Sequence, residues 1–206
     1  MVVYGDLQSG NCLKVKLLLS LLGIEHQWQH INILENETHT TEFLALNPNG
    51  KIPVVVLDDG RVLYESNAIL SYFAEDTPYL PQDSFLKAKV FQWLFFEQYS
   101  HEPYIAVARY IQVYLGMPAD RVEQYEALHA KGYKALDVME QQLAQTPYLV
   151  GDAVTIGDIA LYAYTHVADE GGYDLRDYPH IKRWLQAVAL LHASVDMKEA
   201  FNYFTF

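Results

Sequence analysis

A predicted hairpin in the first third of the chain constrains its fold more than any other stretch. Residues 54–57 (Val-Val-Val-Leu) are typical of a buried strand, and residues 62–64 (Val-Leu-Tyr) of the strand that returns beside it. Between them, Asp-Asp-Gly at 58–60 predicts a tight turn, because glycine adopts a positive φ at no steric cost. The sequence therefore predicts an antiparallel pair of strands here.

The residues that flank this hairpin carry polar groups. Ser66 is a favoured helix N-cap residue, and the apolar residues after it recur at helical spacing. Glu65 thus lies beside a hydroxyl at the positive end of a predicted helix. Pro53 stands at the start of the first strand, where its missing N–H is tolerated. A cis bond there would turn the backbone of Ile52 outward, where it could pair with an extended peptide.

The chain before the hairpin predicts a strand-helix-strand unit, which implies a right-handed parallel pair, followed by a weakly helical segment. Gly23 is expected to close the first helix. With the hairpin and its following helix, the order is β-α-β-α-β-β-α. The first four predicted elements are at residues 2–4, 12–22, 25–33 and 35–46.

A short polar stretch with two prolines predicts a linker, and strand signals stop after it. We expect a first domain over residues 1–76, a linker over 77–84 and an all-α domain over 85–206. Pro103 is expected to bend or break the first long helix of that domain. The predicted helices are at residues 85–115, 120–145, 155–168, 179–191 and 194–203.

One helix start in the second half has a specific signature. Thr155 and Asp158 predict a capping box, in which each side chain bonds to the other residue's backbone N–H. Val154 and Ile159 are placed to form a hydrophobic staple around it. This motif predicts a helix that matters for folding, and we assign it no chemistry.

Composition excludes several classes of partner. Of 206 residues, 51% are hydrophobic and 19% charged, which is ample for a folded core. The formal charge of −12, with only 14 basic residues, argues against binding to nucleic acid or to an anionic membrane. Cys12 is the only cysteine, so no intrachain disulfide can form. With no basic leader and no apolar run of about 20 residues, the expected location is the cytoplasm.

The ordered motifs around the hairpin resemble the glutathione-binding half of the cytosolic glutathione transferases, most closely the bacterial, serine-type, theta- or nu-like members. The motif around Thr155 resembles the helix start in that family's C-terminal domain. The resemblance implies a thioredoxin-like N-terminal domain, a cis Pro53, and an α+β two-domain fold with an all-α second domain. The motifs are Asn-Pro at 47–48, Lys-Ile-Pro at 51–53, Asp-Asp-Gly at 58–60 and Glu-Ser-Asn-Ala-Ile at 65–69.

A glutathione transferase must hold as a thiolate a thiol whose ordinary pKa is about 8.5. The resemblance implies that Ser9 stabilises the thiolate and that Asn11 is its helper, both at the positive end of the first helix. The alternative is that Ser9 only caps that helix. Cys12 lies near the position of the thiol in cysteine-type relatives but comes about one to three residues too late, so a buried apolar role is favoured.

The resemblance also assigns the contacts to glutathione, which is the expected co-substrate. Glu65 would accept the γ-glutamyl ammonium, and Ser66 with the helix amides would hold its α-carboxylate. Lys51 would pair with the glycyl carboxylate. The backbone of Ile52, next to Pro53, would pair with the cysteinyl unit. The alternative for Glu65 and Ser66 is a solvated turn and a cap.

The second substrate is expected between the domains, against the first long helix of the all-α domain. An aromatic-rich wall suits small apolar electrophiles, although most aromatic residues at this spacing are core. His26 and His30 lie in a predicted strand, and no metal site is expected. The candidate lining residues are Tyr99, His101, Glu102 and Tyr104.

The resemblance thus implies a homodimeric glutathione transferase that activates glutathione for attack on a small hydrophobic electrophile. One alternative is glutathione-dependent reduction of disulfides or peroxides at the same site. Another is a non-catalytic binding module, against which the presence of Ser9, Lys51, Glu65 and Ser66 argues.

Overall fold

A computed structural model describes residues 1–193 of the chain. The chain divides into two compact units, Met1–Thr77 and the part that begins at Pro78. Among the described residues, no helix has both the length and the apolar character that crossing a membrane requires.

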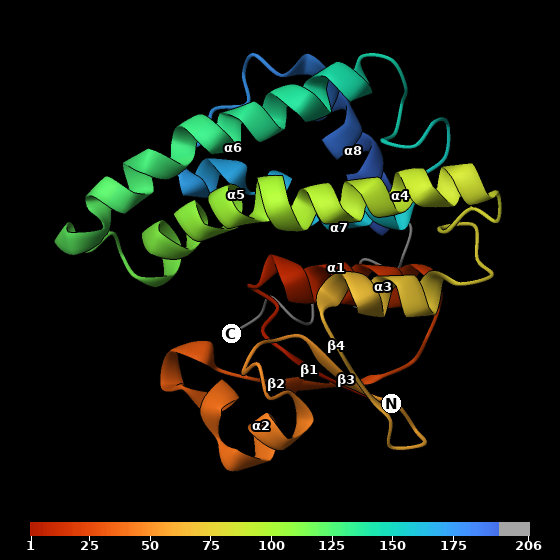
Figure 1. Cartoon of the computed structure of the whole chain (residues 1–206), viewed down its shortest axis with the longest axis vertical. Helices are drawn as coiled ribbons and strands as arrows, with labels where there is room; N and C mark the ends of the chain where they lie inside the picture. The colour runs from red at the N-terminus through yellow and green to blue at the C-terminus, as the bar shows by residue number, and fades with distance from the viewer. Residues whose placement is uncertain (194–206) are drawn as a thin grey trace. The chain divides into compact units, whose positions relative to one another are not determined.

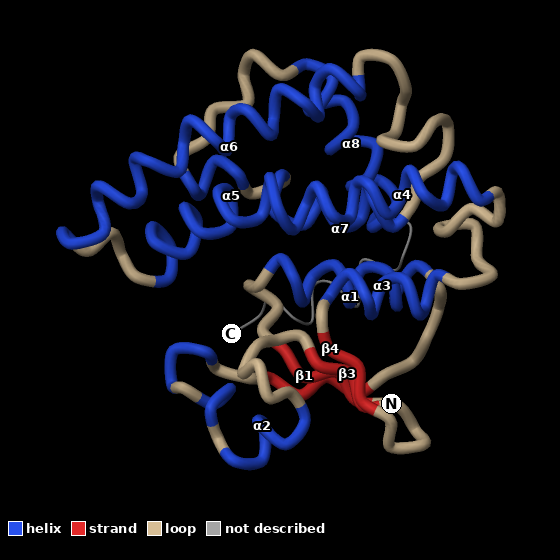
Figure 2. The backbone as a smooth tube through the Cα atoms, in the orientation of Figure 1, coloured by secondary structure: helices blue, strands red, loops and turns tan. Residues whose placement is uncertain are grey.

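The first unit is built on a four-stranded sheet in the order β2-β1-β3-β4. Its strands are drawn in red in Figure 2. β1 pairs in parallel with β2 and antiparallel with β3, which pairs antiparallel with β4. The predicted parallel pair, joined through α1, and the predicted hairpin are therefore both present. The strands are β1 (Val2–Gly5), β2 (Gln27–His30), β3 (Val54–Val56) and β4 (Val62–Tyr64).

Helices cover both faces of this sheet, because successive strand residues point to opposite sides. Val55 packs with residues of α1 (Gly10–Leu21) and α3 (Ser66–Ala74), whereas Val54 packs with Phe43 of α2 (Thr41–Leu46) on the other face. Figure 1 shows α1 and α3 side by side on one face of the sheet and α2 on the other. This packing brings α1 and α3 together.

The backbone geometry confirms three predictions and corrects one. The Ile52–Pro53 peptide bond is cis, and Gly60 and Gly23 have φ values of 84° and 65°. Ser66 is not the cap of α3 but its first residue; Glu65 occupies the cap position, with a φ of 68°. Non-glycine residues rarely adopt that conformation, and the surrounding structure must hold it. The helix therefore begins one residue earlier than predicted, and Glu65 lies at its cap position and not before it.

The second unit is helical in its described part. α4 packs against α7, and α5 packs against α6 and α7 (Figure 1). The predicted helix at 194–203 lies outside the described residues. The main helices are α4 (Ser84–Phe96), α5 (Glu102–Arg109), α6 (Val122–Leu143), α7 (Ile156–Thr165) and α8 (Pro179–Ala193).

The first long helix of this unit changes its winding along its length. Two π-helical turns, Glu97–His101 and Tyr110–Tyr114, precede and follow α5. Pro103 falls in the first turn of α5, where a missing N–H is tolerated, and the π-helical turn lies just before it. The expected disruption is thus a local change of helix type.

The capping box at the start of α7 is confirmed. Oδ2 of Asp158 accepts the backbone N–H of Thr155 at 2.9 Å, and Oγ1 of Thr155 accepts from Gly157 at 3.2 Å. Oδ1 of Asp158 also accepts from the backbone of Leu149 and from the indole of Trp184, both at 2.9 Å. The buried carboxylate therefore joins a loop, α7 and α8.

Candidate functional site

The start of α1 places Ser9 at the N-cap position. Its side chain makes no capping hydrogen bond to the helix amides; it bonds instead with the thiol of Cys12. The loop before it is turned by the Asp6 carboxylate, which accepts the backbone N–H of Gln8 at 2.9 Å. This arrangement argues against the alternative in which the Ser9 side chain only caps the helix.

Cys12 lies wholly within the first unit's core. It is completely buried, and a side chain at Gly5 would collide with its sulfur. Burial raises the pKa of the Cys12 thiol to about 12, against the smaller lowering effects of its hydrogen bonds to the Asp6 backbone and Ser9. A thiol of this kind stays protonated and inert at neutral pH. The structure therefore favours the structural role for Cys12.

Asn11 and Ser66, 55 residues apart in the sequence, are in direct contact. Oγ of Ser66 donates a hydrogen bond to Oδ1 of Asn11 at 3.1 Å. Asn11 lies in the first turn of α1, and Ser66 is the first residue of α3. The residue predicted to assist at the sulfur and the residue predicted to hold a carboxylate thus belong to one cluster.

Lys14 completes this cluster, although it was not among the residues predicted for the site. Its ammonium donates to Oδ1 of Asn11 at 2.8 Å and to Oγ of Ser66 at 3.3 Å, and the residue is fully buried. The available signal was a lysine three residues after Asn11, inside a run predicted to be mostly buried. A charge in such a run requires polar partners, which the two predicted site residues supply.

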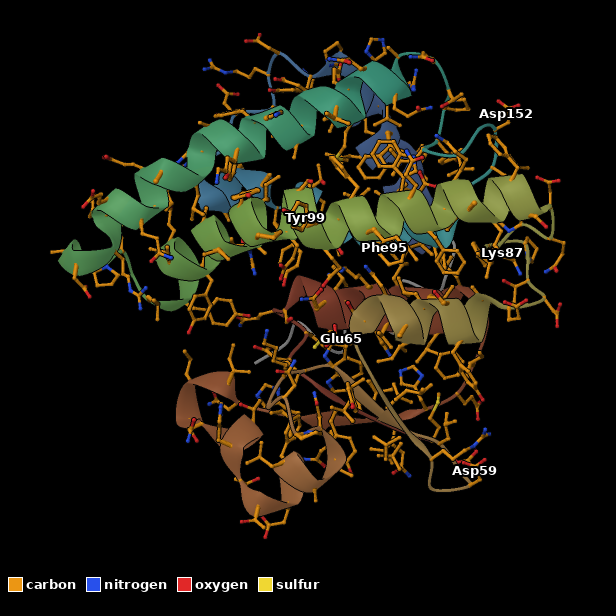
Figure 3. The ribbon with its side chains drawn as sticks, viewed as in Figure 1. Asp59, Glu65, Lys87, Phe95, Tyr99 and Asp152 are labelled. Carbon is orange, nitrogen blue, oxygen red and sulfur yellow. The ribbon has the colours of Figure 1, made fainter. Side chains whose placement is uncertain are left out.

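Glu65 stands directly before this cluster. It is exposed, and Figure 3 shows it at the beginning of α3. Its neighbour Ser66 is buried. The free N–H groups of the first helical turn and the partial positive charge of the helix end lie at the same point. This part of the unit combines a carboxylate with a site suited to an anion.

The loop before β3 is held by a buried asparagine. Nδ2 of Asn47 donates to the carbonyl oxygen of Lys51 at 2.7 Å, and its Oδ1 accepts from the backbone of Asn49 at 3.0 Å. Lys51 is exposed, Ile52 half-buried and Pro53 buried. The lysine is therefore accessible on a loop whose backbone is fixed from within.

The four candidate lining residues of the second unit have different environments. Tyr99 is 84% exposed, and Glu102 is half-buried. The Tyr104 ring lies 5.3 Å from the ammonium of Lys131, and the buried His101 has its Nε2 2.9 Å from Oγ1 of Thr165. Their role as lining residues stays a prediction.

The described residues contain no group of three or more His, Cys, Asp or Glu side chains arranged to hold a metal ion. An open depression in the second unit shares no residue with the predicted site. Several of its groups are already paired: Tyr178 donates to Asp137 at 2.9 Å, and His180 contacts Glu140 at 2.7 Å. Its lining is Tyr133, Asp137, Glu140, Gln141, Asp174, Asp177 and Tyr178.

Two family models match this chain. The glutathione S-transferase N-terminal domain matches residues 8–76, and the glutathione S-transferase C-terminal domain matches residues 103–191. Glutathione S-transferase D7 of Anopheles gambiae is 32% identical over 190 residues, with 90% of this chain and 84% of that protein covered.

Solved structures agree with these matches. A glutathione S-transferase from Pseudomonas fluorescens is 61% identical with a TM-score of 0.89, covering 90% of this chain and 92% of that one. A glutathione transferase from Burkholderia graminis, with two glutathione molecules bound per subunit, is 26% identical with a TM-score of 0.80, covering 95% and 87%. The predicted two-domain fold is confirmed. By both its sequence and its fold, the chain belongs to the glutathione S-transferase family.

Proposed function

We propose that this chain is a serine-type glutathione transferase, in which Ser9 and Asn11 stabilise the glutathione thiolate for attack on a small hydrophobic electrophile. The observation that carries the site assignment is the hydrogen bond of 3.1 Å between Ser66 and Asn11. It joins the residue proposed to bind the γ-glutamyl carboxylate to the residue proposed to assist at the sulfur. Family membership supports glutathione as the co-substrate.

The chemistry rests on electrostatic stabilisation of the sulfur anion. A hydrogen bond from Ser9 to a thiolate is worth about 1.5–3 kcal/mol, which lowers the thiol pKa by roughly one to two units. The partial positive charge at the start of α1 acts in the same direction. The proposal requires the Ser9 hydroxyl to turn from Cys12 to the ligand, which is a rotation about one side-chain bond.

Four further residues would hold the rest of the tripeptide. Glu65 accepts the γ-glutamyl ammonium, and Ser66 with the first amides of α3 holds the α-carboxylate. Lys51 pairs with the glycyl carboxylate, and the backbone of Ile52, next to Pro53, pairs with the cysteinyl unit. The exposure of Glu65 and Lys51 supports these roles, because both charges are accessible to a ligand.

Glutathione-dependent disulfide reduction is a second candidate. The Burkholderia graminis relative binds two glutathione molecules per subunit, and two thiols are what the reduction of one disulfide consumes. In that reaction the first thiolate attacks the disulfide and releases one thiol. The second glutathione then attacks the mixed disulfide, which releases the other thiol and yields oxidised glutathione. Because Cys12 is buried, neither step uses a thiol of this chain.

We further propose that the protein is a cytoplasmic homodimer. Phe85 and Phe95 of α4 and Tyr99 just after it are 71%, 70% and 84% exposed. Phe95 and Tyr99 are four residues apart and so share a helix face (Figure 3). A second copy would cover these rings; Tyr99 would then belong to the dimer contact instead of the substrate wall. The net charge of −12 supports the absence of nucleic-acid partners.

Titration of the bound thiol tests the proposed function. The ultraviolet absorbance of the thiolate, measured against pH with glutathione bound, should give a thiol pKa at least about one unit below that of free glutathione. Ser9→Ala should restore most of the free value while leaving glutathione bound. A normal thiol pKa in the wild-type complex would instead favour the non-catalytic module. Turnover with aryl halides, epoxides, hydroperoxides and mixed disulfides then separates conjugation from reduction.

A further inference from the structure

A fully buried lysine lies among the predicted glutathione-site residues. Lys14 is on α1, and the residues that follow it on that helix, Val15 and Leu17, are buried in the core. Burial of an ammonium is costly unless hydrogen bonds replace its lost water. The position of Lys14 therefore indicates that its charge has a role that a leucine could not fill.

The ammonium of Lys14 makes a triangle of contacts with two site residues. It donates to Oδ1 of Asn11 at 2.8 Å and to Oγ of Ser66 at 3.3 Å. Ser66 in turn donates its hydroxyl hydrogen to the same Oδ1 at 3.1 Å. Two donors thus converge on the carbonyl oxygen of the Asn11 amide. The Ser66 hydroxyl donates one hydrogen bond and accepts another.

These contacts determine which way the Asn11 amide faces. An ammonium has three donors and no acceptor, so the atom of Asn11 nearest Lys14 must be the oxygen. The NH₂ group of the amide consequently points away from Lys14. A thiolate is an acceptor, so only this orientation lets Asn11 assist it.

The geometry points to Lys14 as a positioning residue for the glutathione site, and this inference rests on the function proposed above. Lys14 turns the Asn11 amide so that its N–H groups face the ligand's sulfur. It also fixes the Ser66 side chain, whose hydroxyl hydrogen goes to Asn11, so that the backbone N–H of Ser66 at the start of α3 is positioned for the γ-glutamyl carboxylate. Its positive charge lies next to both residues that would meet the two anionic groups of the ligand. One buried side chain would thereby couple the sulfur and the γ-glutamyl carboxylate.

Substitution of Lys14 by methionine, which is similar in length but uncharged, tests the inference. In Lys14→Met the pKa of bound glutathione's thiol should rise by about one unit relative to wild type. Binding of S-methylglutathione, which has no ionisable thiol, should weaken about tenfold through the loss of order at Ser66. Lys16→Met is the matched control, because it removes the same charge from the same helix outside this triangle, and it should change neither quantity.

A double-mutant comparison separates positioning from simple charge. If Lys14 acts through Asn11, Lys14→Met should add almost no thiol pKa shift in an Asn11→Ala background. A full additional shift in that background would mean that Lys14 acts on the sulfur by charge alone, which overturns the positioning role. Unchanged thiol pKa and unchanged S-methylglutathione affinity in the single variant would overturn it as well.

Two controls keep the results interpretable. Thermal unfolding identifies a variant that fails to fold, and Lys14→Leu then takes the place of Lys14→Met, since apolar replacements of buried charges are often tolerated. The wild-type protein must first bind glutathione with a lowered thiol pKa. If the wild-type protein does not do so, the proposed function is contradicted. If it does, but the Lys14 variants behave like wild type, only the role of Lys14 is contradicted.

Discussion

The side-chain amide of Asn47 donates a hydrogen bond of 2.7 Å to the carbonyl oxygen of Lys51. Asn47 is buried, whereas Lys51 is exposed on the loop before β3. A buried group thus holds the backbone of Lys51, the residue proposed to pair with the glycyl carboxylate. Such an arrangement makes the loop's order depend on a residue that need not touch glutathione.

Asn47→Ala should weaken glutathione binding by roughly three- to tenfold, because a net hydrogen bond contributes about 0.5–1.5 kcal/mol. The thiol pKa of bound glutathione should stay as in wild type, since Ser9 and Asn11 are unaffected. Isothermal titration calorimetry and ultraviolet titration measure the two quantities. Asn49→Ala, an exposed position in the same loop, serves as control. A shifted thiol pKa in Asn47→Ala would show that the change spreads to the sulfur site.

The thiol of Cys12 should be unreactive in the folded protein. Burial raises its pKa to about 12, so very little thiolate is present at pH 8, and the sulfur is not accessible. Iodoacetamide should leave the native chain unlabelled. In urea it should add one label per chain, as followed by mass spectrometry. Cys12→Ala should keep glutathione-dependent turnover. Rapid labelling of the native chain together with loss of turnover would instead indicate a cysteine-type enzyme.

Asp158 should be a main determinant of stability. Its carboxylate accepts hydrogen bonds from the Leu149 and Thr155 backbones and from the Trp184 indole, all at 2.9 Å. Its Oδ2 also accepts the hydroxyl of Thr155 at 3.0 Å. Asp158→Ala leaves these four buried donors without their acceptor and should lower the free energy of unfolding by about 3 kcal/mol or more.

Urea unfolding followed by tryptophan fluorescence, at a fixed protein concentration, measures this loss. Thr155→Ala should cost less, about 0.5–2 kcal/mol, because it removes the cap and only one of the four hydrogen bonds to Asp158. Asp152→Ala, at an exposed carboxylate nearby (Figure 3), should be close to neutral. Equal losses in all three variants would contradict the role assigned to the Asp158 network.

His166 should make the protein less stable in mild acid. Burial, with a further contribution from the charge of Arg109, lowers the pKa of His166 below its ordinary value of 6.5. The unfolded chain therefore takes up the proton first, so the stability is fully present above about pH 6.5 and falls as the pH drops below it. His166→Asn, whose amide can replace the Nδ1 contact with the Tyr162 carbonyl at 3.0 Å, should show a weaker decrease. Thermal unfolding between pH 7.5 and 5 checks this; parallel curves for the two proteins would contradict it.

Local patterns predicted much of the fold. The turn at Gly60 and the capping box at Thr155 and Asp158 depend on residues within a few positions of one another, so their chemistry can be read directly from the sequence. The cis Ile52–Pro53 bond followed from the family resemblance. The boundary at Ser66 was one residue off, because a glutamate with positive φ at the cap is rare and the chain around it must enforce that conformation.

The sequence by itself determined the order of strands and helices, the hairpin and the polar residues at the two helix starts, since these depend on local spacing and side-chain type. Only the tertiary structure decided that Asn11 meets Ser66 and that Lys14 is buried between them. The physical reason is that burial and contact over 55 residues arise when α1 packs against α3 on one face of the sheet. The spacing of residues along the chain does not show which residues of α1 and α3 come into contact.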